Sequence, residues 1–343
     1  MAKRVLICPL NWGLGHATRC IPVIRELERS GCEVLIAGDG DSLALLKIEF
    51  PSNRFFELPS YGISYSARIP LVLHFFSLAP KVIAAIKKER HAVSDIVARE
   101  KIDFIISDNR YGCYHPKVPS AIIIHQLNLR ASPFSRLANH YNETFIKQFR
   151  ECWVPDLPDH SLSGDLSANK NIAHKFIGPL SRMKKSKSAV SLQVLGLVSG
   201  PEPHRTALDN VLRDHLTRSG LSFKVVRGLP SQAPGEGDMI SHLPSGQLNG
   251  LIESAEVVIS RSGYSTIMDL AALHKKAIFI PTPGQTEQLY LAQEMQRKKI
   301  APMVLQKKLS LQTAMEQLKD YTGFREDYFS NNHLQTTLRE FLG

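Results

Sequence analysis

The chain has 343 residues, a length that favours two domains over one. Its apolar content of 43% is typical of a globular protein, and no run approaches the roughly 18 consecutive apolar residues of a membrane-spanning helix. The formal net charge of +10 favours anionic partners; no nucleic-acid-binding module can be identified, which leaves phosphorylated substrates or an acidic membrane surface.

Five cysteines are dispersed along the chain, with no C-x-x-C pair and no metal-ligand spacing. An odd number of dispersed thiols in a long chain fits a reducing compartment, so we expect a cytoplasmic protein. The apolar run at 5–10 is too short for a signal peptide, and we expect it to form the first strand.

The first half of the chain alternates strands and helices, and its strands are apolar on both faces. Such alternation predicts the α/β class, with a parallel sheet covered by helices. The expected strands are 4–9, 32–37, 55–58, 102–107, 121–124 and 152–155, and the expected helices are 18–30, with Gly31 as its C-cap, and 78–100.

A segment rich in lysine and serine at 181–188 interrupts this pattern and is the best linker candidate. We therefore predict an N-terminal domain at 1–178, a C-terminal domain at 179–322, and a final helix at 323–343 that could pack back onto the first domain. In the second half the expected strands are 193–198, 223–226, 257–260 and 277–281, and the expected helices are 205–219, 248–254, 267–274 and 288–298.

The loop after the first expected strand, Gly13-Leu14-Gly15-His16, opens a helix. Its glycines let the backbone approach a ligand closely, but Thr18 replaces the last glycine of a dinucleotide-binding fingerprint. His16 stands where a doubly wound sheet faces its ligand, and the pKa range of histidine suits a general base. The alternative is a helix-terminal residue that only makes a backbone hydrogen bond.

Polar residues also follow two later strands of the first half. Asp108, Asn109 and Arg110 follow one strand, and His125 and Gln126 follow the next. By the same rule these residues lie on the ligand side of the sheet. We expect them to contact an acceptor substrate, although polar residues are common in loops of every kind.

The second half opens with a similar loop. Ser199 and Gly200 could donate hydrogen bonds to a diphosphate, and Arg205 could add positive charge. The structural alternative is a turn built by Pro201 and Pro203.

The stretch 257–270 reads as a buried strand, a tight turn of small residues and the start of a helix. That helix start could hold a phosphate, and Asp269 could accept hydrogen bonds from a ribose diol. The spacing Thr266-x-x-Asp269 also matches a helix-capping arrangement, which is the structural alternative. After the next strand come amide and carboxylate groups that suit sugar hydroxyls. The residues singled out are Ser262, Gly263, Ser265, Thr266, Asp269, Gln285, Glu287 and Gln288.

Together these motifs resemble those of the GT-B glycosyltransferases, above all glycosyltransferase family 28, its MurG-related members, and uncharacterised bacterial and archaeal proteins like them. The likeness is carried by Gly-Leu-Gly-His-Ala-Thr-Arg at 13–19, Ser-Asp-Asn-Arg-Tyr-Gly at 107–112 and Pro-Thr-Pro-Gly-Gln-Thr-Glu-Gln at 281–288, and it covers nearly the whole chain. It implies two Rossmann-like domains with parallel sheets facing a central cleft. It also implies a nucleotide-sugar donor held by the C-terminal domain and inversion at the anomeric carbon, with no metal or other cofactor.

The resemblance also implies roles for single residues. His16 is the candidate catalytic base, and Arg205 or Arg261 would stabilise the leaving diphosphate. Related transferases have glutamate where this chain has Asp269, and the shorter side chain changes the reach by about 1.5 Å. The expected donor-binding residues are Gly15, Ser199, Gly200, Arg205, His242, Leu243, Arg261, Ser262, Gly263, Ser265, Thr266, Asp269, Gln285, Glu287 and Gln288, with His242 and Leu243 at the nucleobase.

We therefore expect an inverting, metal-independent transfer of a sugar from a nucleotide-diphosphate sugar, with UDP favoured, to a hydroxyl acceptor in cell-envelope glycan synthesis. Two alternatives stay open. One is a non-hydrolysing nucleotide-sugar 2-epimerase on the same fold, and the other is a nucleotide-sugar-binding protein without turnover.

The segment 69–80 is strongly apolar, and basic residues follow it up to position 90. One interpretation is a peripheral contact with the inner face of the cytoplasmic membrane, which would admit a lipid-linked acceptor. The other is a helix pair buried on the first domain, or a wall of the acceptor pocket.

Overall fold

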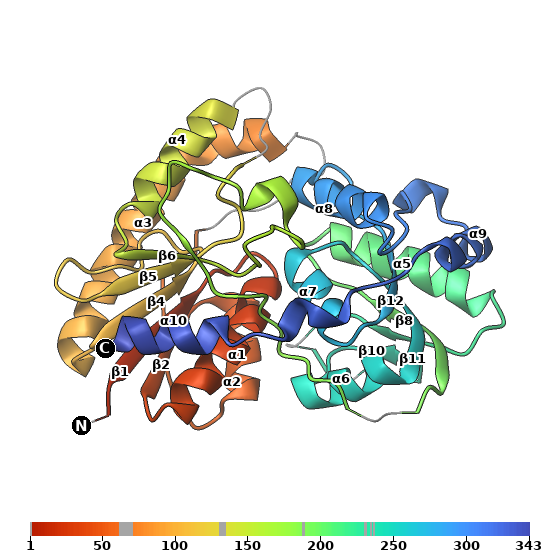
Figure 1. Ribbon diagram of the computed structural model, residues 1–343, viewed down its shortest axis with the longest axis horizontal. Coiled ribbons are helices and arrows are strands. Elements are labelled where there is room, and N and C mark those ends of the chain that lie inside the picture. The colour runs from red at the N-terminus through yellow and green to blue at the C-terminus, as the bar shows by residue number, and fades with distance from the viewer. Residues whose placement is uncertain are drawn as a thin grey trace. The chain divides into compact units, whose positions relative to one another are not determined.

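The computed structural model describes residues 2–61, 71–129, 135–186, 189–229, 232–233, 235 and 237–343, with the backbone alone for 71–80. The chain divides into two compact units. The first comprises residues 1–12, 16–180 and 331–343, and the second comprises residues 13–15 and 181–330. Each unit is built around one parallel sheet (Figure 1).

The sheet of the first unit has seven strands in the order β3-β2-β1-β4-β5-β6-β7. Its central strands are buried on both faces, which explains their continuous apolar sequence. The strands are β1 (Arg4–Pro9), β2 (Glu33–Gly38), β3 (Arg54–Glu57), β4 (Phe104–Asp108), β5 (Ser120–Ile123), β6 (Glu151–Val154) and β7 (Lys175–Phe176).

Helices cover this sheet, and Val93 and Ile96 of α3 pack on Leu6, Leu35 and Ile105. The helices of the unit are α1 (Gly15–Arg29), α2 (Gly40–Glu49), α3 (Leu71–Glu100), α4 (Ser135–Ile146) and α10 (His333–Leu342). Two of them, α2 and α4, were not predicted. The apolar residues of α2 do not gather on one face, so its sequence lacks the helical periodicity that identified the others.

The last helix, α10, completes the core of the first unit. The ring of Phe341 lies 5.0 Å from that of Trp153 on β6 and 5.4 Å from that of Phe104 on β4, measured between centroids. Lys3 Nζ donates to the backbone oxygen of Leu342 at 2.5 Å. Residues at the two ends of the chain therefore share one core, as the blue helix beside the red strands shows (Figure 1).

The sheet of the second unit has five strands in the order β10-β9-β8-β11-β12. Leu208 and Leu212 of α5 pack on Val194, Val257 and Ile259. The strands are β8 (Leu192–Leu197), β9 (Phe223–Val226), β10 (Met239–Ile240), β11 (Ala255–Ser260) and β12 (Lys276–Phe279), and the helices are α5 (His204–Thr217), α6 (Ser245–Ser254), α7 (Tyr264–Ala272), α8 (Thr286–Arg297) and α9 (Leu311–Gln317). The predicted α/β class with two parallel sheets is confirmed.

Both sheets reverse their winding at one point. In the first unit β1 lies between β2 and β4, and in the second β8 lies between β9 and β11. Open α/β sheets bind ligands at the carboxyl ends of the strands beside such a switch point. We therefore expect ligand-binding residues directly after β1 and β4 in the first unit, and directly after β8 and β11 in the second.

The apolar segment 69–80 can be followed only in part. Residues 69 and 70 lie outside the described residues, and 71–80 form the first turns of α3. The basic side chains that follow on α3, Lys81, Lys87, Lys88 and Arg90, are exposed. Within the described ranges, no helix is both long and apolar enough to cross a bilayer. Contact of this segment with a membrane surface stays a prediction.

Candidate active site

His16 and Asp108 meet at the switch point of the first unit. His16 lies in the first turn of α1, directly after the β1 loop, and Asp108 ends β4, where it pairs with Pro9 of β1. The two side chains are joined through His16 Nδ1 and Asp108 Oδ1 at 2.6 Å. Asp108 is fully buried, whereas 12% of the His16 side chain is exposed. The imidazole is thus the partner that can reach a ligand.

Arg19 holds Asp108 from the next turn of α1. Its Nε donates to Oδ2 of Asp108 and its Nη2 donates to Oδ1, which makes a buried bidentate ion pair. Arg19 belongs to the motif at 13–19, but no role was predicted for it. Its spacing of three residues from His16, which places both on one face of the helix, was the available signal.

The ion pair fixes the protonation of His16. Burial raises the pKa of Asp108, but Arg19 and His16 outweigh it and lower that pKa to about 2, so the carboxylate is ionised at neutral pH. His16 Nδ1 has two partners: Asp108 Oδ1 at 2.6 Å, which can only accept, and Arg19 Nη2 at 2.9 Å, which can only donate. The shorter contact, to the ionised carboxylate, favours the tautomer with the proton on Nδ1 and the lone pair on Nε2. Burial lowers the pKa of His16, Arg19 lowers it further, and Asp108 opposes both. The imidazole is therefore neutral at pH 7 and carries the lone pair of a general base.

His125 is the third group around Arg19. It follows β5, is 7% exposed, and its Nδ1 lies 2.7 Å from Nη1 of Arg19. A guanidinium can only donate, so His125 accepts at Nδ1 and carries its own proton on Nε2. Arg19 thus connects Asp108 and both histidines at the ends of three adjacent strands.

Asn109 and Gln126, which were also predicted to bind the acceptor, have different surroundings. Asn109 has a positive φ of 57°, and its buried Oδ1 has no hydrogen-bond partner among the described residues. The backbone oxygen of Gln126 accepts from Asn142 Nδ2 at 3.0 Å. Both stay candidates for acceptor contact.

Arg110 requires a correction, because its side chain is fully buried. It pairs with Glu89 on α3 and with Asp39 Oδ1 at 2.8 Å, and it donates to the backbone oxygen of Pro59 at 2.8 Å. These contacts join the loops after β2, β3 and β4. We assign Arg110 to the fold of this edge and no longer to the acceptor.

We expect Glu89→Gln to lower the free energy of unfolding by about 3–5 kcal/mol, because it removes the charge opposite a buried guanidinium. The fully buried Glu89 carboxylate also accepts from the backbone N–H of Gly112 at 2.8 Å. Urea unfolding of the purified variants measures the change. As a control, Asp214→Asn breaks an exposed pair with Arg218 and should change stability by less than about 1 kcal/mol. Equal effects of the two variants would contradict a structural role for the Glu89 pair.

Three helices begin near the switch point of the second unit. Ser199 and Gly200 follow β8, and Gly263, after β11, is the N-cap of α7. Gly200 has a φ of 105°, a conformation that favours glycine. The helices α5, α7 and α8 begin after β8, β11 and β12, so their positive dipole ends point to this edge. The edge is suited to an anion such as a diphosphate.

Arg261 also serves the fold. This corrects its predicted role, which was to stabilise the leaving diphosphate. It is fully buried, and burial lowers its pKa to about 10. It donates to the backbone oxygens of Ile280 at 3.1 Å and His204 at 3.0 Å, and to Oε1 of Gln306 at 2.8 Å. The guanidinium fastens the end of β12 to the start of α5. Arg205 keeps its predicted place, since it lies in the first turn of α5 and is 17% exposed.

Several predicted donor contacts already have partners inside the protein. Ser262 Oγ donates to the backbone oxygen of Gln288 at 2.7 Å, and Gln288 Oε1 accepts from the backbone N–H of Thr282 at 2.9 Å. Asp269 Oδ1 accepts from Ser181 Oγ at 2.7 Å. The first two contacts hold the turns after β11 and β12 to α8, and the third joins α7 to Ser181.

The helix-capping alternative for Thr266 and Asp269 is wrong, because both lie within α7, whose N-cap is Gly263.

The remaining donor candidates lie at or near the ends of helices and strands. Gly15 is the first residue of α1, Ser265 lies in the first turn of α7, His242 and Leu243 lie between β10 and α6, and Gln285 and Glu287 are the N-cap and first turn of α8.

Among the described residues, no group of three or more His, Cys, Asp or Glu side chains is placed to hold a metal ion. An Asp-x-Asp sequence is present at Asp39-Gly40-Asp41. Asp39 is the partner of Arg110.

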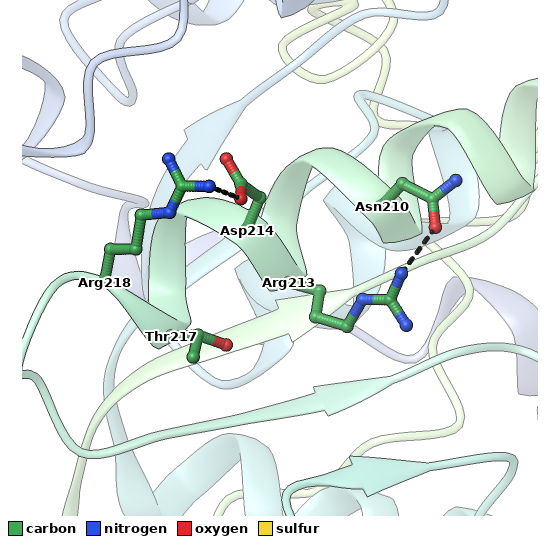
Figure 2. A pocket seen from close by; sticks show the side chains of 5 residues that line it. All are labelled: Asn210, Arg213, Asp214, Thr217 and Arg218. Atoms are coloured by element: carbon green, nitrogen blue, oxygen red, sulfur yellow. Dashed lines mark hydrogen bonds and ion pairs between the residues drawn. The ribbon is translucent and has the colours of Figure 1, made fainter.

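A separate hollow lies on the outer side of α5 (Figure 2). Its charged groups are paired along the helix, with Arg218 Nη2 at 2.5 Å from Asp214 Oδ1 and Arg213 donating to Asn210 at 3.1 Å. It lies on the helix and not at the carboxyl end of a strand, so we do not count it as a candidate site.

Comparison with known proteins agrees with this geometry. Residues 235–341 match the family model described as the glycosyltransferase family 28 C-terminal domain. The chain is 25% identical over 321 residues to an uncharacterised glycosyltransferase of Methanosarcina mazei, an alignment that covers 83% of this chain and 81% of that protein. It is 23% identical over 357 residues, covering 96% and 94%, to the UDP-N-acetylglucosamine--N-acetylmuramyl-(pentapeptide) pyrophosphoryl-undecaprenol N-acetylglucosamine transferase of Clostridium perfringens.

Solved structures show the same fold. The glycosyltransferase SnogD from Streptomyces nogalater superposes with a TM-score of 0.68 at 14% identity, over 100% of both chains. The spinosyn rhamnosyltransferase SpnG, complexed with thymidine diphosphate, superposes with a TM-score of 0.60 at 14% identity, over 99% of this chain and 95% of that chain. The chain therefore has the GT-B fold of these glycosyltransferases, and its residues 235–341 match the family 28 C-terminal domain.

Proposed function

We propose that the protein moves a sugar from a nucleoside-diphosphate sugar to a hydroxyl group, with inversion at the anomeric carbon. The observation that carries this proposal is the His16–Asp108 pair, joined at 2.6 Å, in which the neutral imidazole presents a lone pair at Nε2. A base of this kind suits an acceptor hydroxyl, which must lose its proton as it attacks.

The proposed step is a direct displacement. The acceptor oxygen forms a bond to the anomeric carbon, the bond from that carbon to the diphosphate oxygen breaks, and the nucleoside diphosphate leaves with the electron pair. His16 Nε2 takes the hydroxyl proton, and the resulting imidazolium is stabilised by Asp108, which accepts from Nδ1. The base afterwards returns its proton to water.

We assign donor binding to the switch point of the second unit. The starts of α5, α7 and α8 and the charge of Arg205 would stabilise the leaving diphosphate, so the proposal requires no metal. Glu287, in the first turn of α8, is the candidate for the sugar hydroxyls. UDP is the favoured nucleotide, because the Clostridium perfringens relative is named for UDP-N-acetylglucosamine.

The acceptor is a hydroxyl compound, and the name of the same relative supports a lipid-linked one. In that case the exposed basic residues Lys81, Lys87, Lys88 and Arg90 of α3 would face the anionic surface of the membrane. This finer assignment is independent of the chemistry proposed for His16.

A panel of UDP, GDP and thymidine diphosphate, with their sugars, tests the proposal. We expect at least one nucleotide to raise Tm, by mass action, and the matching sugar donor to release its nucleotide slowly with water as the acceptor. NMR of the first-formed free sugar should show the anomer opposite to that of the donor. Formation of an epimer at C2 would support the epimerase instead, and a panel with no stabilising nucleotide would overturn the proposal.

A further inference from the structure

Arg19 contacts every other side chain that the candidate active site of the first unit is built from, although it was not among the predicted site residues. Its side chain is 2% exposed. Besides its bidentate pair with Asp108, it reaches both imidazoles: Nη2 lies 2.9 Å from Nδ1 of His16, and Nη1 lies 2.7 Å from Nδ1 of His125. One rigid, planar guanidinium on α1 thus contacts the end of β4 and the loop after β5 as well as its own helix.

These contacts place a positive charge directly beside the proposed base. Nη2 of Arg19 and Oδ1 of Asp108 contact each other, and both approach Nδ1 of His16, at 2.9 and 2.6 Å. The guanidinium destabilises a protonated imidazole, and the carboxylate stabilises it. Burial lowers the pKa of His16 most, Arg19 lowers it next, Asp108 raises it, and His125 has a smaller lowering effect. The charged and titratable groups that act on His16 in the described part of the first unit are therefore Arg19, Asp108 and His125.

The other arm of the guanidinium orients the second imidazole. A guanidinium only donates, so the contact at 2.7 Å requires a lone pair on Nδ1 of His125 and puts its ring proton on Nε2. The loop that carries this ring is itself held, because Asn142 on α4 donates to the backbone oxygen of Gln126 at 3.0 Å. His125 therefore has a fixed loop on one side and Arg19 on the other, which gives its ring a defined orientation.

We propose that Arg19 is a positioning residue of the transfer reaction: its guanidinium fixes the imidazoles of His16 and His125 in one arrangement, and its charge keeps His16 neutral between turnovers. Lysine cannot replace it, because an ammonium group is a point charge without the planar fork that reaches three side chains at once. The proposal rests on the proposed function only for the role of His16 as the base. The arrangement of the rings can be measured without any substrate.

The first test observes the rings directly in the unaltered full-length protein. Long-range proton–nitrogen NMR of isotope-labelled histidines distinguishes a protonated ring from each of the two neutral tautomers, and His16→Ala and His125→Ala assign the signals. At neutral pH we expect His16 to be neutral and His125 to be the tautomer with its proton on Nε2. A His125 ring with its proton on Nδ1, or a protonated His16, would overturn the proposal.

Two variants then separate the shape of Arg19 from its charge. Arg19→Lys keeps a charge beside Asp108, so we expect the acidic midpoint of the pH profile to be retained while kcat falls by about 10- to 100-fold, with KM little changed, because the imidazoles are misplaced. Arg19→Gln removes the charge, so the acidic midpoint and the NMR titration of His16 should both move to higher pH. Arg25→Lys is the matched control, because Arg25 lies on the same helix and pairs with Glu49 at 3.2 Å while 37% exposed.

The outcomes are separable. A kcat in Arg19→Lys equal to that of the control would overturn the positioning role, and a titration of His16 that does not move in Arg19→Gln would overturn the role of the charge. If Arg19→Gln does not fold, Arg19→Lys and the ring states of the unaltered protein still decide the proposal. If the unaltered protein transfers no sugar, the proposed function fails, whereas the NMR result stands by itself.

Discussion

His16→Ala should lower kcat by about 10²–10⁴-fold and leave the affinity for the nucleotide within about twofold, because it removes a proton acceptor and no donor contact. The fold should tolerate the change, since Arg19 still neutralises the buried Asp108. Steady-state kinetics and nucleotide titration measure the two effects. His91→Ala, an exposed histidine on α3, is the matched control and should behave like the unaltered protein.

The pH profile gives a second readout of the same residue. Burial and Arg19 lower the pKa of His16 from its ordinary value of 6.5, so activity should fall on the acidic side with a midpoint below 6.5. The neutral form is the active one, and the rate should therefore rise through that midpoint to a plateau on its alkaline side. A profile whose acidic limb persists in His16→Ala would assign the limb to another group and remove His16 from the chemistry.

Asp108→Asn should lower kcat by about 10³–10⁴-fold, the scale seen when the carboxylate of a His–Asp pair is made neutral. An amide can donate to His16 Nδ1 and so stabilise the wrong tautomer, with the proton on Nε2. Asp95→Asn, which is exposed on α3, is the control. Turnover that survives in Asp108→Asn would mean that the pair serves the fold and not the reaction.

Asp108 also makes a prediction about acid stability. Its pKa in the folded protein is about 2, below the ordinary 3.8, so the folded state binds its proton more weakly than the unfolded state does. Its contribution to stability is therefore complete above about pH 4 and is lost as the pH falls toward 2. Asp108→Asn should be less stable at neutral pH, because Arg19 loses its counter-charge, and its stability should depend less on pH in this range. Urea unfolding at a series of pH values measures both effects.

The sequence allowed most of the sheet to be predicted, because buried parallel strands have an unmistakable composition. The runs at 4–9 and 223–226 are strands within the predicted limits. The helix α2 escaped prediction because its apolar residues do not follow a helical period. The position of His16 could be inferred from a strand, a glycine and a helix start, which are local features.

The partners of the candidate residues could not be inferred in the same way. Asp108 lies 92 residues from His16 in the chain, and only the pairing of β1 with β4 brings them together. Arg110 and Arg261 follow strands at the expected edges, yet both turn inward. Loops at the end of a parallel sheet expose backbone carbonyls that need donors, and one buried guanidinium satisfies several of them. A basic residue after a strand is therefore a weak sign of ligand binding.

Because α10 packs on the first unit, cutting the chain between the two units does not release two separate domains. Residues 1–12, 16–180 and 331–343 form the first unit, while 13–15 and 181–330 form the second. A protease that cuts within 181–188 would produce a C-terminal fragment that still carries α10, with Phe341 seated against Trp153. The two fragments would stay together without a covalent bond between them. For the same reason, a stop codon placed after residue 180 would leave the first unit with part of its apolar surface open to water, so neither half of this protein is a self-contained product of a single cut.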